Sequence, residues 1–308
     1  MHVKGKKVVV PAFTCDSVIE PFVEMGYEIE PYSLKDDLTI NLEKLEQQID
    51  EFKPSVVLFH RYFGFDTCKG IEKIIHRDGI ITIEDETQYI FSEPRQTWSD
   101  YQIGSIRKWG AFPDGAYLAS KKKIISQPVE EDDKLIRLEL QAMKKKQAYL
   151  DKKSNETDYR QMFADTREYV DAQKQTFSMS AVSNYNLEKL NVKQFADAHH
   201  KNAKILIDGL QGFSWFDCVF KSIPDGITPF MIPLMVHEGR KELQCYLASE
   251  KIFATVIWGC PDATKEKLED TDKRIYDEIL CIPCDYRYDD QDMTRIIEAV
   301  QKYEKKSF

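Results

Sequence analysis

The sequence predicts an α/β protein, in which a mostly parallel sheet flanked by helices is followed by a smaller α+β domain. Short apolar runs alternate with segments whose apolar residues recur at helical spacing, which indicates strands joined by helical crossovers. Runs such as Val8 to Val10 and Val56 to Phe59 are apolar throughout, as in strands buried on both faces. A chain of 308 residues can bury two such lobes. We expect the larger domain to comprise residues 1–183 and the smaller one residues 184–308.

The first elements are bounded by clear signals. The apolar run Val8 to Phe13 is followed by a helical stripe that stops at Gly26, before a second run at Glu28 to Tyr32. Asn41 can cap the next helix, and Pro54 marks its end. These signals predict the order strand, helix, strand, helix.

Three turns of this sheet carry polar side chains. Two further strands are predicted at Val56 to Phe59 and Ile80 to Ile83, and His60 and Asp85 lie just past them. Lys108 follows a later strand in the same way. Because ligands of parallel sheets bind beyond the carboxyl ends of the strands, we expect the three turns to converge on one crevice.

The sequence changes in character after Lys123. Residues 130–172 are highly charged, and their apolar positions predict two long amphipathic helices with an exposed joint near Ser154.

The remainder predicts the smaller domain. It contains a helix that ends at Gly209, strands within Phe230 to Val236 and Phe253 to Trp258, and a final helix that Asp289 or Asp290 can cap.

Composition argues against several classes of function. A formal net charge of -9 disfavours a nucleic-acid-binding surface, which needs a basic excess. No apolar run approaches the roughly 20 residues of a membrane span. Seven scattered cysteines without a preceding signal peptide favour reduced thiols in the cytoplasm. Cys281 and Cys284 form one CxxC, and no second CxxC completes a zinc site, so no metal is expected.

Asp85, Gln88 and Lys108 together suggest the chemistry of an aldehyde cofactor with a pyridine ring. A carboxylate such as Asp85 keeps the ring nitrogen protonated, and Gln88 can donate to the phenolic oxygen. Lys108 can bind the aldehyde covalently and then move the substrate's proton. Each residue alone also has an ordinary structural explanation, as a strand-terminal acid, a polar turn residue or a surface lysine.

Neighbouring residues extend this candidate site. The Ser105 hydroxyl can bind a cofactor phosphate, and Arg107 can add charge-assisted hydrogen bonds to it. His60 can lie near the ring or a substrate carboxylate, although a structural histidine explains it equally well.

Four segments carry a family resemblance: Val8 to Thr14, His60-Arg61-Tyr62-Phe63-Gly64, Glu84 to Gln88, and the lysine loop Ser105 to Gly115. They resemble the DegT family of pyridoxal-phosphate-dependent sugar aminotransferases, which have the aspartate aminotransferase fold (fold type I). Two further segments, Leu187 to Leu190 and Ile282 to Ile297, are similar to the C-terminal lobe of that family, so the resemblance covers nearly the whole chain.

The resemblance implies an activity and a site. Lys108 carries pyridoxal 5'-phosphate, Asp85 pairs with the pyridine nitrogen, and Gln88 approaches the phenolic oxygen. An amino acid, with glutamate expected, donates its amino group to a keto-sugar nucleotide, and the enzyme is a cytoplasmic homodimer. The further cofactor-binding residues are Phe13, His60 and Ser105.

Three departures from the family leave an alternative open. No Ser-Gly-Thr-like turn precedes Val8, so we expect the main phosphate cradle to be missing or supplied from elsewhere. Cys15 replaces the aromatic residue that stacks on the ring, and Thr176 replaces an asparagine that reaches the partner's phosphate. The alternative is a truncated or degenerate relative that binds the cofactor weakly or not at all and acts as a binding or structural partner.

Overall fold

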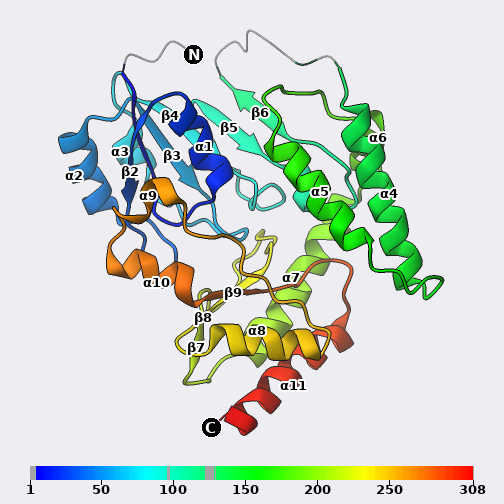
Figure 1. The fold of residues 1–308 in the computed structure, drawn as a ribbon. Coiled ribbons are helices and arrows are strands. Elements are labelled where there is room, and N and C mark those ends of the chain that lie inside the picture. Colours follow the sequence, from blue (N-terminus) through cyan, green and yellow to red (C-terminus); the bar gives the residue numbers. More distant parts are fainter. Residues whose placement is uncertain (1–4, 96–97, 122–127, 129, 308) are drawn as a thin grey trace. The chain divides into compact units, whose positions relative to one another are not determined.

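A computed structural model of the chain describes residues 5–95, 98–121, 128 and 130–307 (Figure 1). Contacts divide the chain into two compact units. Unit 1 consists of Met1–Gln102 and Asn191–Phe308, and unit 2 of Ile103–Leu190. The unit boundary at Leu190 lies close to the domain boundary predicted at residue 183, but the boundary at Gln102 has no predicted counterpart. Since units defined by contacts need not be domains, the division at residue 183 stays a prediction.

The larger sheet, whose first strands belong to unit 1, has the strand order β2-β1-β3-β4-β5-β6. Its first four strands are parallel, and the unit boundary falls within β5. The predicted strands lie within one or two residues of the observed ones, so the predicted α/β class is confirmed. The strands are β1 (Lys7–Pro11), β2 (Glu28–Tyr32), β3 (Val56–His60), β4 (Ile81–Asp85), β5 (Tyr101–Gly104) and β6 (Tyr117–Ser120).

Helices cover both faces of the parallel strands. Val8 and Val10 pack in one apolar cluster with residues of α1 (Asp16–Glu24). Val9 belongs to a second cluster, with residues of α2 (Leu42–Phe52) and α3 (Glu72–Ile75). Side chains of a strand alternate between faces, so burial on both sides explains why the central strands β1 and β3 are almost entirely apolar.

The cap predicted for α2 is confirmed. The Asn41 side chain accepts a hydrogen bond from the Lys44 N–H at 3.3 Å, and the helix ends at Lys53 in the left-handed conformation, directly before Pro54.

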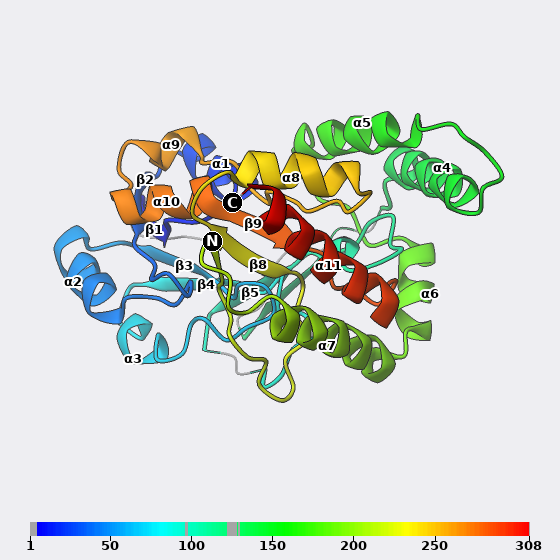
Figure 2. The ribbon, with the colours of Figure 1, turned by 90° about the horizontal axis from the view of Figure 1, so that it is seen from below.

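The C-terminal part of unit 1 is a small antiparallel sheet, β7-β8-β9, with helices packed on it (Figure 2). The predicted strand at Phe253 to Trp258 is wrong. Only Thr255 forms an isolated bridge, with Cys281 of β9, and Phe253 is exposed. The elements are α7 (Val192–Gly209), β7 (Phe216–Cys218), β8 (Ile232–Val236), α8 (Arg240–Ser249), α9 (Asp262–Lys265), α10 (Asp270–Glu278), β9 (Ile279–Ile282) and α11 (Asp290–Ser307).

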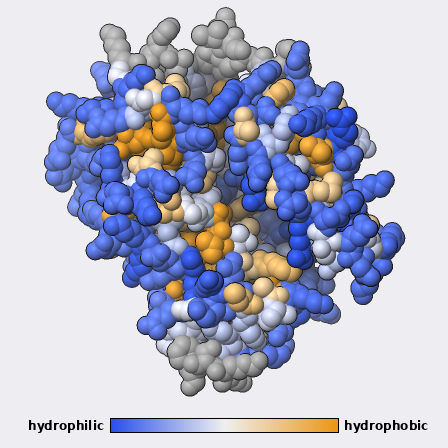
Figure 3. Space-filling model, in the orientation of Figure 1, coloured by the Kyte–Doolittle hydropathy of each residue, from blue (hydrophilic) through white to orange (hydrophobic). Residues whose placement is uncertain are grey.

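Unit 2 contains the predicted pair of long helices, α4 (Asp133–Leu150) and α5 (Tyr159–Asp171), which pack against each other. Mostly hydrophilic residues cover the visible part of these helices (Figure 3). The third helix of the unit is α6 (Ala181–Lys189). Within the part of the chain that the structure describes, no helix combines the length and apolar character needed to cross a membrane.

Candidate functional site

Three polar side chains, two buried and one largely buried, meet at the carboxyl ends of β1, β3 and β4. Nε2 of His60 lies 2.8 Å from Oγ1 of Thr14, and Nδ1 of His60 lies 3.3 Å from Oδ2 of Asp85. His60 and Asp85 are the last residues of neighbouring parallel strands and are paired in register. Of the turns predicted to converge, the structure therefore brings those of His60 and Asp85 together.

Asp85 is held as a carboxylate. Its Oδ1 accepts the Thr87 N–H at 2.8 Å, while Oδ2 faces His60. Burial alone would raise the pKa of Asp85, but the hydrogen bond from His60, the charge interaction with His60 and the hydrogen bonds from Thr87 together outweigh it and leave the pKa below its usual value. The side chain is 13% exposed. Each carboxylate oxygen has two lone pairs, so Asp85 can accept a further N–H from a ligand.

This ionisation predicts a specific acid sensitivity. A carboxyl group whose folded pKa is lowered stabilises the protein above its unfolded pKa, and that contribution disappears as the pH falls through the folded value. Asp85→Asn should therefore lower the free energy of unfolding at pH 7, and the difference from the wild type should shrink below about pH 4. Urea unfolding at several pH values measures this. The exposed Asp225→Asn is the control, and an Asp85 difference that does not change with pH would contradict the prediction.

Gln88 is buried and oriented by the backbone. Its Oε1 accepts the Phe63 N–H at 2.7 Å, which assigns the oxygen to that side and leaves the amide NH₂ as a donor. Phe63 and Gly64 form the turn after β3, and both have positive φ angles. A side chain at Gly64 would meet the backbone oxygen of Thr228 at 2.2 Å, so the turn requires glycine.

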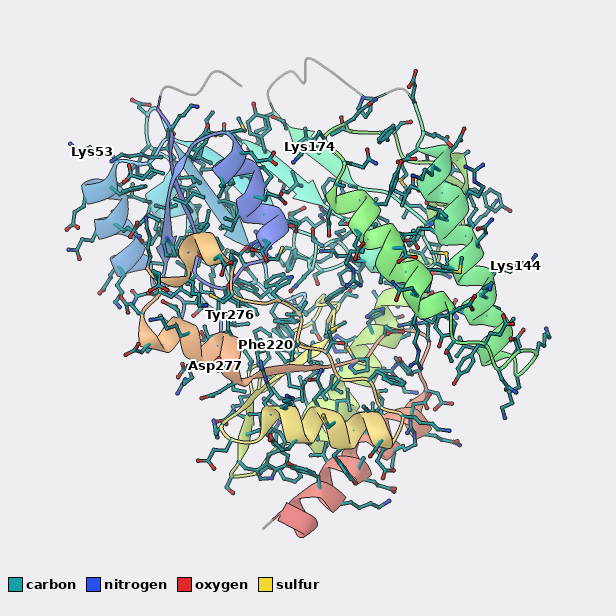
Figure 4. All side chains as sticks on the ribbon, viewed as in Figure 1. Lys53, Lys144, Lys174, Phe220, Tyr276 and Asp277 are labelled. Atoms are coloured by element: carbon teal, nitrogen blue, oxygen red, sulfur yellow. The ribbon has the colours of Figure 1, made fainter. Side chains whose placement is uncertain are left out.

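An aromatic group surrounds this end of the sheet. The Phe13 ring lies 4.9 Å from that of Trp258 and 5.0 Å from that of Tyr276, and Trp258 lies 5.8 Å from His60. Tyr276, on α10, is labelled in Figure 4. Phe13 is fully buried, so the structure places it beneath the site, and its contact with a cofactor stays a prediction.

A buried ion pair lies on the residues next to His60 and Asp85. Nε of Arg61 donates to Oε1 of Glu84 at 2.5 Å, and both side chains are almost fully buried. Burial raises the pKa of Glu84, although Arg61 counteracts it. The Arg61 guanidinium also lies over the rings of Tyr89 and Trp98 and donates to Asp66. The pair secures β3 to β4 where both strands end.

The lysine loop belongs to unit 2. Lys108 is exposed and is the last residue of a 3₁₀ helix, Ile106–Lys108, with Ser105 at its N-cap position. The backbone N–H groups of Ile106 and Arg107 both donate to the Gly115 carbonyl oxygen, so the loop closes on itself. The positions of Ser105 and Lys108 beside Asp85 stay predictions.

Asp114 ties this loop to helix α6. Its carboxylate accepts hydrogen bonds from the Ser180 N–H at 2.8 Å, the Ser180 hydroxyl at 2.6 Å and the Ser183 hydroxyl. Because Ser180 is the N-cap residue of α6, Asp114 anchors the N-terminus of this helix to the loop.

No role was predicted for three residues at this end of the sheet. Thr14 follows the first strand, and its position at the same sheet edge as His60 was the available signal. Trp258 lies in the segment wrongly predicted to be a strand, and Tyr276 lies on an ordinary amphipathic helix, so only the tertiary structure identifies them. Within the described residues, no group of three or more His, Cys, Asp or Glu side chains could hold a metal ion.

No protein-family model matches the sequence, and no curated protein matches it either. Solved structures do match. A DegT DnrJ EryC1 StrS aminotransferase from Brucella abortus is 18% identical, with a TM-score of 0.67 over 98% of this chain and 80% of that chain. DesV from S. venezuelae, in complex with a ketimine intermediate, is 16% identical, with a TM-score of 0.69 over 98% and 79%.

A third structure carries a different activity on the same fold. The E. coli GDP-4-keto-6-deoxy-D-mannose-3-dehydratase with bound hydrated PLP is 15% identical, with a TM-score of 0.67 over 96% of this chain and 80% of that chain. Identities this low establish the fold and not the activity. The chain therefore has the fold type I architecture of the solved sugar aminotransferases, as its sequence predicted.

Proposed function

We propose that this protein is a pyridoxal-phosphate-dependent enzyme of the sugar aminotransferase type. The observation that carries the proposal is the ionised Asp85, held by His60 at a sheet edge beside the donor amide of Gln88. The solved structures that share the fold support it, since two of them hold a ketimine intermediate or hydrated PLP.

The chemistry of these side chains fits the cofactor. A protonated pyridine nitrogen needs an anionic acceptor, and Asp85 has unused lone pairs. A phenolic oxygen needs a donor, and the Gln88 NH₂ remains after its oxygen has bound Phe63. When bound, pyridoxal phosphate would supply an aldehyde and an electron-withdrawing ring.

The other predicted residues complete the proposal. Lys108 would bind the aldehyde carbon and transfer the substrate's proton at its Nζ. The Ser105 hydroxyl and the Arg107 guanidinium would bind the phosphate. We include glutamate as the amino donor, a keto-sugar nucleotide as the acceptor, a homodimer and a cytoplasmic location, as the resemblance implies.

The half-reaction with glutamate tests the function. Protein purified with added pyridoxal phosphate should show visible absorption of bound cofactor, and glutamate should convert it stoichiometrically to the amine form while 2-oxoglutarate appears. No bound cofactor at saturating concentration would reject the proposal and favour the degenerate relative. If the cofactor binds but no amino acid converts it to the amine form, the proposed cofactor site would stand and the proposed transfer of an amino group would be wrong.

The donor role of Gln88 gives a separate prediction. In Gln88→Glu the carboxylate still accepts the Phe63 N–H but no longer donates to the phenolic oxygen. The dissociation constant of pyridoxal phosphate should rise about tenfold or more, since one hydrogen bond to a charged group is lost and a like charge is added. Absorbance titration measures it. The exposed Gln141→Glu on α4 is the matched control, and equal affinities for both variants would contradict the donor role.

A further inference from the structure

Thr14 is buried against the one ring nitrogen of His60 that does not face Asp85. Its hydroxyl lies 2.8 Å from Nε2, and the residue has no exposed surface. The backbone of Thr14 is also held. Its N–H donates to the Tyr276 hydroxyl at 2.9 Å, and that hydroxyl can donate in turn to the carbonyl oxygen of Ala12 or of Thr14 itself, each at 2.9 Å.

Hydrogen-bond accounting determines which proton lies where. An ionised carboxylate only accepts hydrogen bonds, so Nδ1 of His60 carries the proton in its 3.3 Å contact with Oδ2 of Asp85. Nε2 then either accepts the proton of the Thr14 hydroxyl or, on a charged ring, donates to that oxygen. Among the described residues the Thr14 hydroxyl has His60 as its single hydrogen-bond partner. A charged ring would therefore leave a buried O–H donor without an acceptor, which is costly.

We propose that Thr14 is a positioning residue that holds His60 as the neutral tautomer protonated on Nδ1, so that Asp85 retains a net negative charge. A charged imidazole would neutralise the carboxylate and weaken it as the partner of a cationic ring nitrogen. The value of this arrangement for cofactor binding rests on the proposed function, whereas the tautomer itself does not.

The tautomer can be measured in the protein without cofactor. Nitrogen-15 NMR of histidine-labelled protein at pH 7 distinguishes protonated from unprotonated ring nitrogens, and the signals lost in His60→Gln assign His60 among the six histidines. The expected result is a protonated Nδ1 and an unprotonated Nε2. A ring protonated on both nitrogens, or on Nε2 alone, would overturn the inference.

Two variants test the part of the Thr14 hydroxyl. Thr14→Val removes it at nearly constant shape, so the Nε2 resonance should move downfield as its hydrogen bond is lost. Thr14→Ser keeps the hydroxyl and should leave that resonance near its wild-type position. An unchanged Nε2 resonance in Thr14→Val would show that Thr14 is not the donor. If Thr14→Val does not fold, the wild-type spectrum still decides the tautomer.

Cofactor titration separates this inference from the proposed function. The dissociation constant of pyridoxal phosphate should rise about three- to tenfold in Thr14→Val and stay within about twofold in Thr14→Ser. If the wild-type protein shows the expected tautomer but does not bind the cofactor, the proposed function is wrong and the inference about His60 still holds. Equal affinities in the wild type and Thr14→Val, with the NMR change present, would reject the link between Thr14 and the cofactor.

Discussion

Lys108→Ala is expected to abolish covalent attachment of pyridoxal phosphate and to reduce the transfer rate by about 10²–10⁴-fold. The alanine has no amine to react with the aldehyde or to move the substrate's proton. Borohydride reduction of wild-type protein loaded with cofactor, followed by peptide mapping, should place a stable adduct within the loop Ser105 to Gly115. The variant should show no adduct there, while the dissociation constant for non-covalent binding can still be measured.

The exposed Lys144 on α4 gives a matched control in the same unit. Lys144→Ala should retain the adduct and the rate, because an exposed lysine reacts with the aldehyde only weakly and reversibly. An adduct that persists in Lys108→Ala, or one that maps to another lysine in the wild type, would show that the cofactor lysine is misassigned.

Glu84→Gln should lower the free energy of unfolding by about 3–5 kcal/mol. The substitution keeps the size of the side chain but removes the buried one of two carboxylates that offset the Arg61 guanidinium, which is 1% exposed. The remaining partner, Asp66, is 32% exposed. Ser99 and Gln102 donate to the second Glu84 oxygen, and an amide NH₂ in that place would face donors. Denaturant unfolding monitored by circular dichroism measures the loss.

Glu20→Gln, an exposed change on α1, is the corresponding control and should stay within about 0.5 kcal/mol of the wild type. A loss below about 1 kcal/mol in Glu84→Gln would mean that Asp66 alone compensates the Arg61 charge. A double variant, Arg61→Met with Glu84→Gln, should recover part of the stability, since it removes a buried charge that has lost its buried partner.

Much of the fold could be predicted from the sequence, because its strands and helices carry local signals. The Asn41 cap and the apolar runs of β1 and β3 are properties of short segments, and they lie where predicted. The strand prediction at Phe253 to Trp258 was wrong because apolar residues also occur in loops that cover a hydrophobic core. There Trp258 packs on the cluster around Phe13, and Thr255 makes one bridge only.

The site could be predicted in part, for a related reason. His60 and Asp85 are adjacent because parallel strands end at one edge, a rule that needs no coordinates. The contact between Nε2 of His60 and Thr14 could not be predicted, since the two residues are 46 positions apart and no local pattern in the sequence links them. Tyr276 is more distant still, 262 residues beyond the Thr14 whose N–H it binds.

The hydrogen bonds of Tyr276 also limit how this chain can be divided into fragments that fold. Helix α10 comes late in the sequence, yet its tyrosine satisfies backbone groups of the turn that follows the first strand. A recombinant fragment that ends before α10 would expose the Phe13 ring and leave the Thr14 amide without its acceptor. The parallel sheet is therefore not a transplantable module, and protein engineering that grafts it elsewhere would need to carry α10 as well.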